Sequence, residues 1–115
     1  MYKIRWQEDA IEDMKRMRLR AYDVAEIVDA VDEQLTHEAE RITKNKKILR
    51  PGQRLPFEHL EPVWQLRVRD FRVFYDVTPP EAEDEREGEG VVHEAIVSVR
   101  AVRHKPGHKT TKEIL

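Results

Sequence analysis

The chain has 115 residues, of which 38% are charged and 39% hydrophobic, and a net charge of −2. This length suits a single domain over residues 1–115 with one two-layer core. It contains no cysteine, which excludes disulfides, thiolate zinc sites and cysteine nucleophiles. No apolar run reaches the roughly 18 residues of a membrane helix, and the first residues lack an apolar signal-peptide core, so we expect a soluble cytoplasmic protein without membrane contact.

The charge is distributed unevenly along the chain. Residues 1–40 carry a net charge of −5, residues 41–80 carry +5, residues 81–90 carry −5 and residues 91–115 carry +3. A polyanion responds to the local field of a protein rather than to its average charge. The basic middle and tail therefore leave a nucleic-acid partner open.

The first third of the chain predicts a strand and then a helix. Apolar and basic side chains alternate over residues 2–6, which is typical of a strand. Residues 7–17 change to helical spacing, with acids at the start and bases at the end that suit the helix dipole. The expected buried side of this helix consists of Ala10, Met14 and Met17, with Ile11 beside them.

A second helix is predicted over residues 21–35, because one apolar stripe runs through the whole segment. The stripe consists of Ala21, Val24, Ala25, Val28, Val31 and Leu35. The short join between the two helices predicts that they pack antiparallel.

Residues 37–61 show no clear period, and such a long connection is either functional or contains a short element. Its basic side chains belong to a solvated loop or to an arm that positions RNA phosphates, and both interpretations stay open. These side chains are Arg41, Lys44, Lys46, Lys47, Arg50 and Arg54.

Three strands are predicted in the second half, over residues 63–68, 71–77 and 91–104, and a turn and a short helix follow them. The acidic insert 79–90 is expected to be a flexible, solvated tip, although it could repel nucleic acid or dock a basic partner. The order β-α-α-β-β-β predicts an α+β domain with a small antiparallel sheet and the two helices on one face.

The hairpin of residues 64–75 contains two arginines that should face each other. With Arg69 and Asp70 as the turn, Arg67 lies opposite Arg72, and opposite residues share a face of the sheet. One face is then apolar throughout and suited to burial: Trp64, Leu66, Val68, Phe71, Val73 and Tyr75. The other face presents Gln65, Arg67, Arg72 and Phe74.

Two like charges in direct opposition are unfavourable unless both splay into water or bind an anion. Arg103, His104 and Lys105 are expected at the same end of the sheet. Cations around an aromatic ring on an open sheet face suit a phosphate backbone with a base stacked on the ring. We therefore favour a phosphate-binding site over two solvated arginines.

The segments LEPVWQLRVRDFRVFYDV, residues 60–77, and VSVRAVRHKPGHK, residues 97–109, resemble the RelE/ParE superfamily of toxins from type II toxin–antitoxin modules. The opening YKIRWQEDAIEDM resembles the first strand and helix of that superfamily. Arg69 replaces its usual glycine and Phe71 its usual tyrosine. The resemblance spans most of the chain except residues 37–59 and 79–90.

The resemblance implies a metal-independent endoribonuclease of the RelE-like branch that cleaves messenger RNA, in association with the ribosome, and inhibits translation. The RNA 2′-hydroxyl would attack the adjacent phosphate while protein groups move protons and stabilise the phosphorane. The expected catalytic set is Arg67, Arg72, Arg103, His104 and Lys105. The expected RNA contacts are Lys44, Lys46, Lys47, Arg50, Arg54, Gln65, Phe74 and His108.

Arg72 matches the superfamily's hairpin arginine, and Gln65 stands where some members carry a lysine that could act as general base. No tyrosine follows residue 75, so the tyrosine role is vacant, and we expect His104 or His108 to fill it. The three remaining histidines, at positions 37, 59 and 93, lie too far apart to suggest a metal site, and no cofactor is expected.

Two alternatives stay open. The ParE branch shares the fold but inhibits DNA gyrase without catalysis, and a degenerate relative could be a non-toxic binding protein. In each case we expect a bacterial or archaeal protein. In the toxin readings, an antitoxin would cover the arginines in a toxin–antitoxin hetero-oligomer.

Overall fold

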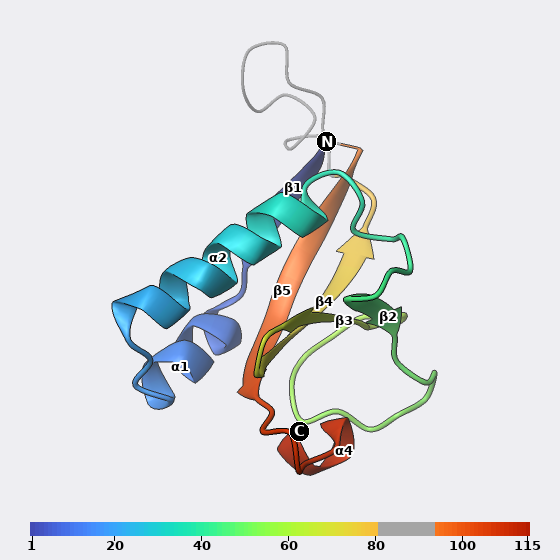
Figure 1. The fold of residues 1–115 in the computed structure, drawn as a ribbon. Helices are drawn as coiled ribbons and strands as arrows, with labels where there is room; N and C mark the ends of the chain where they lie inside the picture. The colour runs from blue at the N-terminus through green and yellow to red at the C-terminus, as the bar shows by residue number, and fades with distance from the viewer. Residues whose placement is uncertain (81–93) are drawn as a thin grey trace.

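The computed structural model describes residues 1–80 and 94–115 and has the predicted α+β architecture, with α1 and α2 on one side of a five-stranded sheet (Figure 1). The acidic run Glu81–Glu89 and His93 lie outside the described residues. The elements are β1 (Tyr2–Trp6), α1 (Glu8–Arg16), α2 (Ala21–Leu35), β2 (Lys46–Ile48), β3 (Trp64–Val68), β4 (Phe71–Thr78), β5 (Ala95–His104) and α4 (Thr111–Ile114).

The strands are arranged in the order β1-β5-β4-β3-β2. The last four form antiparallel ladders, as predicted, but β1 pairs parallel with β5. A parallel pair needs a long connection rather than a tight turn, and everything from α1 to β4 lies between these two strands in the chain. β2 is the short element within residues 37–61, where the sequence left that possibility open.

The register of the β3–β4 hairpin agrees with the prediction at all five pairs, including Arg67 opposite Arg72 and Trp64 opposite Tyr75. Its apolar face is buried under the helices. The predicted stripe of α2 is partly wrong, because Ile27 is fully buried while Val28 is 39% exposed. Ile27, Val31 and Leu35 follow one another at one helical turn, so this row is the one that meets the sheet.

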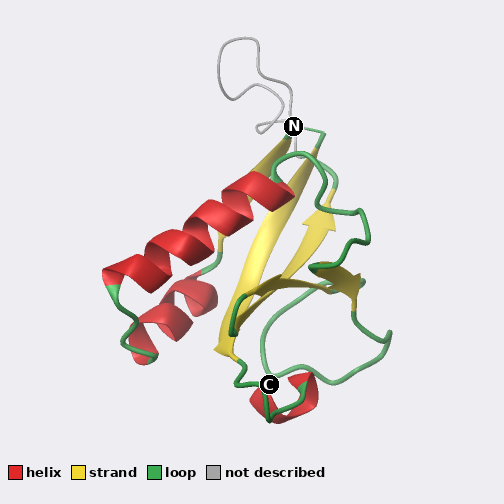
Figure 2. Ribbon diagram, viewed as in Figure 1, coloured by secondary structure: helices red, strands yellow, loops and turns green. Residues whose placement is uncertain are grey.

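The second face of the sheet is also covered, which corrects the prediction of an open face. Figure 2 shows the long loop between β2 and β3, together with α4, on the side away from α1 and α2. Apolar side chains from the loop and the C-terminal residues pack there on the sheet. The cluster consists of Leu49, Phe57, Val63, Phe74 and Ala101, with Leu55, Ile114 and Leu115 against it.

A buried carboxylate attaches this loop to the sheet. Asp76 is 1% exposed and accepts two hydrogen bonds from Arg100, at 2.8 and 3.2 Å, and one from the Leu60 backbone N–H at 2.8 Å. Arg100 is the extra residue where the pairing of β4 and β5 shifts, since Phe74 pairs with Ala101 and Tyr75 with Val99. The irregularity therefore places a guanidinium beside Asp76.

Tyr75 links the core to the segment that follows α2. Its side chain is fully buried, and its hydroxyl donates a 2.6 Å hydrogen bond to the Ala39 carbonyl. Burial is the main cause that raises the pKa of Tyr75, and the negative charge of Glu40 adds to it.

Within the described residues, no helix is long and apolar enough to cross a bilayer.

We expect the change Tyr75→Phe to lower the free energy of unfolding by about 1–3 kcal/mol near neutral pH, because a buried carbonyl loses its donor. In the wild type, stability should also fall as the pH rises above about 10, where the tyrosine ionises in the unfolded chain but stays neutral in the fold. Urea unfolding from pH 7 to 11 measures both effects. The variant should show a shallower alkaline decline, and an unchanged decline would contradict the assignment.

We expect Asp76→Ala to destabilise the fold by about 3–5 kcal/mol, since it leaves the Arg100 charge and the Leu60 N–H without their partner. Glu58→Ala, at an exposed carboxylate in the same loop, is the control and should change stability by less than about 0.5 kcal/mol. Equal effects of the two substitutions in urea unfolding would show that Asp76 does not hold the loop.

Candidate anion-binding site

A small pocket of about 260 Å³ gathers most of the cations that the sequence singled out. We call it the basic pocket. Its charged lining consists of Lys44, Lys46, Lys47, Arg67, Arg72 and Lys105. Its neutral lining consists of Thr43, Asn45, Gln65 and Thr111. No carboxylate is among these described lining residues, so the pocket attracts anions.

The sheet register explains why distant residues meet in this pocket. Arg67 and Arg72 are a cross-strand pair, and Lys47 pairs with Gln65 on the neighbouring strands. Lys105 directly follows β5, and its backbone N–H donates a 2.5 Å hydrogen bond to the carbonyl of Asp70 in the hairpin turn. The ladders therefore bring cations from β2, β3, β4 and the end of β5 to one place.

Arg72 is held firmly at the floor of the pocket. It is 6% exposed, and its Nη1 donates 2.8 Å hydrogen bonds to the carbonyls of Arg69 and Phe71. Burial is the main cause that lowers the pKa of Arg72, and the neighbouring Arg67 lowers it further. A guanidinium still remains charged in proteins, so a buried positive charge faces the pocket without an ion-pair partner among residues 1–80 and 94–115.

The other basic side chains of the pocket differ in their availability. Lys44, Lys47, Arg67 and Lys105 form no side-chain hydrogen bond or ion pair with the described part of the chain. Lys46 is different, because its ammonium donates to the carbonyls of Gln34 and Glu38 at the end of α2, at 3.1 and 2.7 Å. Burial lowers the pKa of Lys46. Its ammonium therefore caps α2, and its predicted RNA contact stays a prediction.

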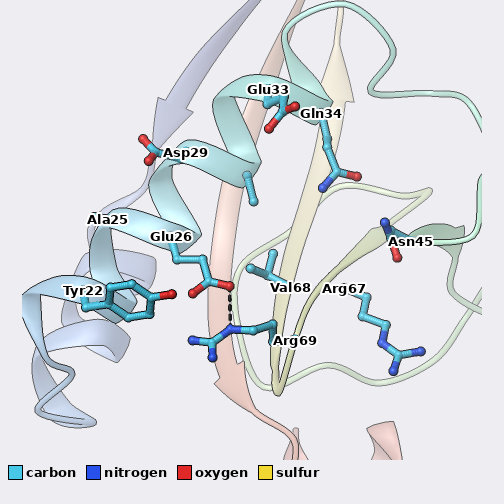
Figure 3. A pocket seen from close by; sticks show the side chains of 11 residues that line it. Tyr22, Ala25, Glu26, Asp29, Glu33, Gln34, Asn45, Arg67, Val68 and Arg69 are labelled. Carbon is cyan, nitrogen blue, oxygen red and sulfur yellow. Dashed lines mark ion pairs between the residues drawn. The ribbon is translucent and has the colours of Figure 1, made fainter.

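The hairpin turn beside the pocket is tied to α2. Arg69 has a φ of 51° and forms an ion pair with Glu26 at 2.5 Å (Figure 3). It forms a second ion pair, with Asp23, that is 3.3 Å long. Its guanidinium also lies 5.6 Å from the centre of the Tyr22 ring. Desolvation lowers the pKa of Arg69, but the neighbouring acids, Glu26 foremost, outweigh it and raise that pKa.

Phe74 and Gln65 do not have the environment that the sequence predicted. Phe74 is fully buried in the second apolar cluster, so it cannot stack an RNA base, because the loop and α4 cover it. Gln65 is 5% exposed and accepts a 3.1 Å hydrogen bond from the Thr111 hydroxyl. Its Oε1 is therefore occupied by α4.

Arg103 and His104 also lie outside the basic pocket. Asp13 accepts a hydrogen bond from the Arg103 guanidinium and a 2.9 Å hydrogen bond from the Val102 N–H. The Arg103 guanidinium lies 5.8 Å from the centre of the Phe57 ring. His104 pairs with Phe71 in the sheet, and its ring lies 5.5 Å from that of Phe71, on the helix side. His104, one of the two histidines expected to move protons, therefore points away from the cations.

The remaining predicted RNA contacts are exposed and lie outside the basic pocket. Arg54 lines a separate cavity of about 660 Å³ near the C-terminus, and Arg50 and His108 lie in exposed loops. Their predicted roles stay predictions. Sequence reasoning missed Thr43, Asn45 and Thr111 as lining residues, because only the packing of the loop and α4 brings them to the sheet. Within the described residues, no cluster of three or more metal-ligating side chains occurs.

Comparison with known proteins agrees with this fold and its basic hairpin. Neither the curated proteins nor the solved structures contain a significant match to the chain. Residues 4–105 match the family described as the ParE toxin of type II toxin–antitoxin system, parDE. The match covers α1, α2, strands β2 to β5 and most of β1, and it confirms the superfamily resemblance of the hairpin. The chain therefore belongs to the ParE toxin family of type II toxin–antitoxin systems.

Proposed function

We propose that this toxin acts on RNA, as an endoribonuclease that holds the scissile phosphate of messenger RNA in the basic pocket and so inhibits translation. The observation that carries the proposal is the convergence of Arg67, Arg72 and Lys105 on one pocket without a carboxylate in its described lining. Phosphate oxygens are the ligands that guanidinium and ammonium groups prefer. The pocket therefore suits a single phosphodiester group.

The pocket can stabilise the transition state of 2′-hydroxyl attack. The 2′-hydroxyl gives its proton to a solvent water while its oxygen bonds to phosphorus, the bond to the 5′-oxygen then breaks, and the phosphorane formed between these two events carries extra negative charge. Arg72 is oriented in advance by two carbonyls, so it can hold that charge without rearrangement, and Arg67, opposite it in the hairpin, can add a second guanidinium. The ammonium of Lys105 or Lys47 can donate the proton that the leaving 5′-oxygen requires.

The second candidate function is inhibition of DNA gyrase without catalysis. Two observations favour it: the chain matches the ParE family, and no His, Tyr, Asp or Glu is among the described residues that line the basic pocket. A ribonuclease needs a group that accepts the 2′-hydroxyl proton near neutral pH, whereas a binding protein needs none. In this function the same cations would contact gyrase or its DNA.

Membership of a toxin–antitoxin family implies an antitoxin partner. We infer that its neutralising segment covers the basic pocket with acidic side chains. Such a segment would remove the repulsion between Arg67 and Arg72 and occlude the phosphate site at the same time. This inference accounts for neutralisation under both candidate functions.

We expect Arg72→Ala to reduce RNA cleavage by about 10²–10³-fold, the usual effect of removing one donor that stabilises a transition-state oxyanion. Cleavage of a labelled messenger, free and bound to ribosomes, measures the rate. The products should carry 2′,3′-cyclic phosphate and 5′-hydroxyl ends. A message with 2′-O-methyl groups should resist cleavage, because it lacks the nucleophile.

Expression in a bacterial host separates the candidate functions. Translation arrest with cut messages supports the ribonuclease, whereas relaxed or broken plasmid with intact messages supports gyrase inhibition. A folded protein without any growth effect would point to a non-toxic relative. An Arg72→Ala protein with full ribonuclease activity would overturn the proposed role of the basic pocket.

A second prediction concerns binding alone. We expect Arg67→Ala to weaken binding of a 2′-O-methyl RNA oligonucleotide and to reduce the slope of log K against log salt by about 0.7, the loss of one phosphate contact. Arg20→Ala is the matched control, since this arginine is also exposed but does not line the basic pocket. Fluorescence anisotropy at several salt concentrations gives both slopes. An equal loss of affinity in the Arg67 variant and in the control would show that RNA also contacts the protein beyond the basic pocket.

A further inference from the structure

Arg69, in the turn of the β3–β4 hairpin, has an unfavourable backbone conformation that contacts of its side chain stabilise. Arg69 has a φ of 51°, a left-handed conformation that glycine adopts freely and that strains other residues. Its side chain is 53% exposed and could extend into water. It instead folds back on α2, where two carboxylates and an aromatic ring surround its guanidinium.

The contacts of Arg69 with α2 come from three residues near the start of that helix. Glu26 lies 2.5 Å from its Nε, Asp23 lies 3.3 Å from its Nη2, and Tyr22 offers its ring face at 5.6 Å. A single exposed ion pair contributes little, but several partners on one guanidinium restrict its position. Figure 3 shows the pair between Glu26 and Arg69 spanning from α2 to the hairpin turn.

The backbone of the same residue contacts the basic pocket. The carbonyl of Arg69 accepts a 2.8 Å hydrogen bond from Nη1 of Arg72, the buried cation of the pocket. The same Nη1 donates to the Phe71 carbonyl, so both acceptors lie at or just after the turn. A displacement of the turn therefore moves the acceptors that orient the Arg72 guanidinium.

We propose that Arg69 is a positioning residue, whose ion pairs with α2 fix the hairpin turn so that its carbonyl holds Arg72 in the orientation that binds phosphate. The inference rests on the proposed function of the basic pocket as an RNA phosphate site. The inference adds Arg69, whose side chain contacts α2 rather than the bound phosphate. Helix α2 thereby becomes part of the support of the anion site.

This positioning role and simple electrostatics predict opposite results for one substitution. Glu26→Gln removes a negative charge near the basic pocket, which by charge alone should strengthen binding of an anion. If Glu26 acts by holding Arg69, the same change releases the turn and weakens binding. Glu33→Gln is the matched control, because Glu33 lies on the same helix and, like Glu26, lines a separate cavity of about 500 Å³ between α2 and the hairpin turn. Glu33 has no ion pair with a described residue.

The experiment measures binding of a 2′-O-methyl RNA oligonucleotide to the full chain at one salt concentration. We expect Glu26→Gln to weaken binding about fivefold, within the usual range for coupling between sites, while Glu33→Gln leaves binding unchanged or tightens it. Glu26→Asp, which keeps the carboxylate, should recover part of the loss. The nuclear magnetic resonance signal of the Arg72 side-chain N–H should shift in Glu26→Gln and stay in place in Glu33→Gln.

Arg69→Gly tests the same contact by removing the arginine side chain instead of the glutamate charge. Glycine tolerates the positive φ, so we expect resistance to urea to be maintained while oligonucleotide binding weakens and the Arg72 signal moves. The inference would be overturned if the Glu26→Gln variant bound the oligonucleotide as tightly as the Glu33→Gln variant and its Arg72 signal did not move. That result would leave the proposed anion site itself unaffected. A wild-type protein that binds no oligonucleotide would overturn the proposed function, and this inference with it.

Discussion

The pairing of Arg67 with Arg72 in the β3–β4 hairpin is the constraint on which the candidate site depends. Because side chains alternate across a strand, this register places six apolar residues under the helices and both arginines on the opposite face. If one of the two strands slipped by one residue, its arginine would turn under α2 and its apolar row would turn outward. The hydrophobic core and the anion site are therefore set by one hydrogen-bond ladder.

One part of the opposite face of the sheet is covered by apolar side chains, and the other part presents accessible cations. The loop before β3, together with α4, buries Phe74 and Ala101 on this face and leaves the end with Arg67 and Arg72 accessible to the pocket. Asp76 holds this cover through Arg100 and the Leu60 N–H. The cover thus turns an exposed sheet surface into a bounded pocket, in which fewer water molecules screen the cations.

The pocket is better equipped to hold charge than to move protons. Arg72 is buried and oriented by backbone carbonyls, an arrangement that suits a developing negative charge. The histidine nearest in sequence, His104, packs beside Phe71 on the helix side of the sheet. This imbalance explains why a ribonuclease and a non-catalytic inhibitor both fit a member of the ParE toxin family.

The sequence by itself determined the helices, four of the five strands and the hairpin register, since these depend on local periodicity of side chains. It also predicted correctly that Arg67, Arg72 and Lys105 gather at one end of the sheet. Only the tertiary structure decided that β1 runs parallel to β5, that Phe74 is buried, and that Lys46 caps α2. These features depend on contacts between residues far apart in the chain, which leave no periodic pattern in the sequence. The same reason hides the ion pair between Arg69 and Glu26, because 42 intervening residues separate a turn from the helix on which it rests.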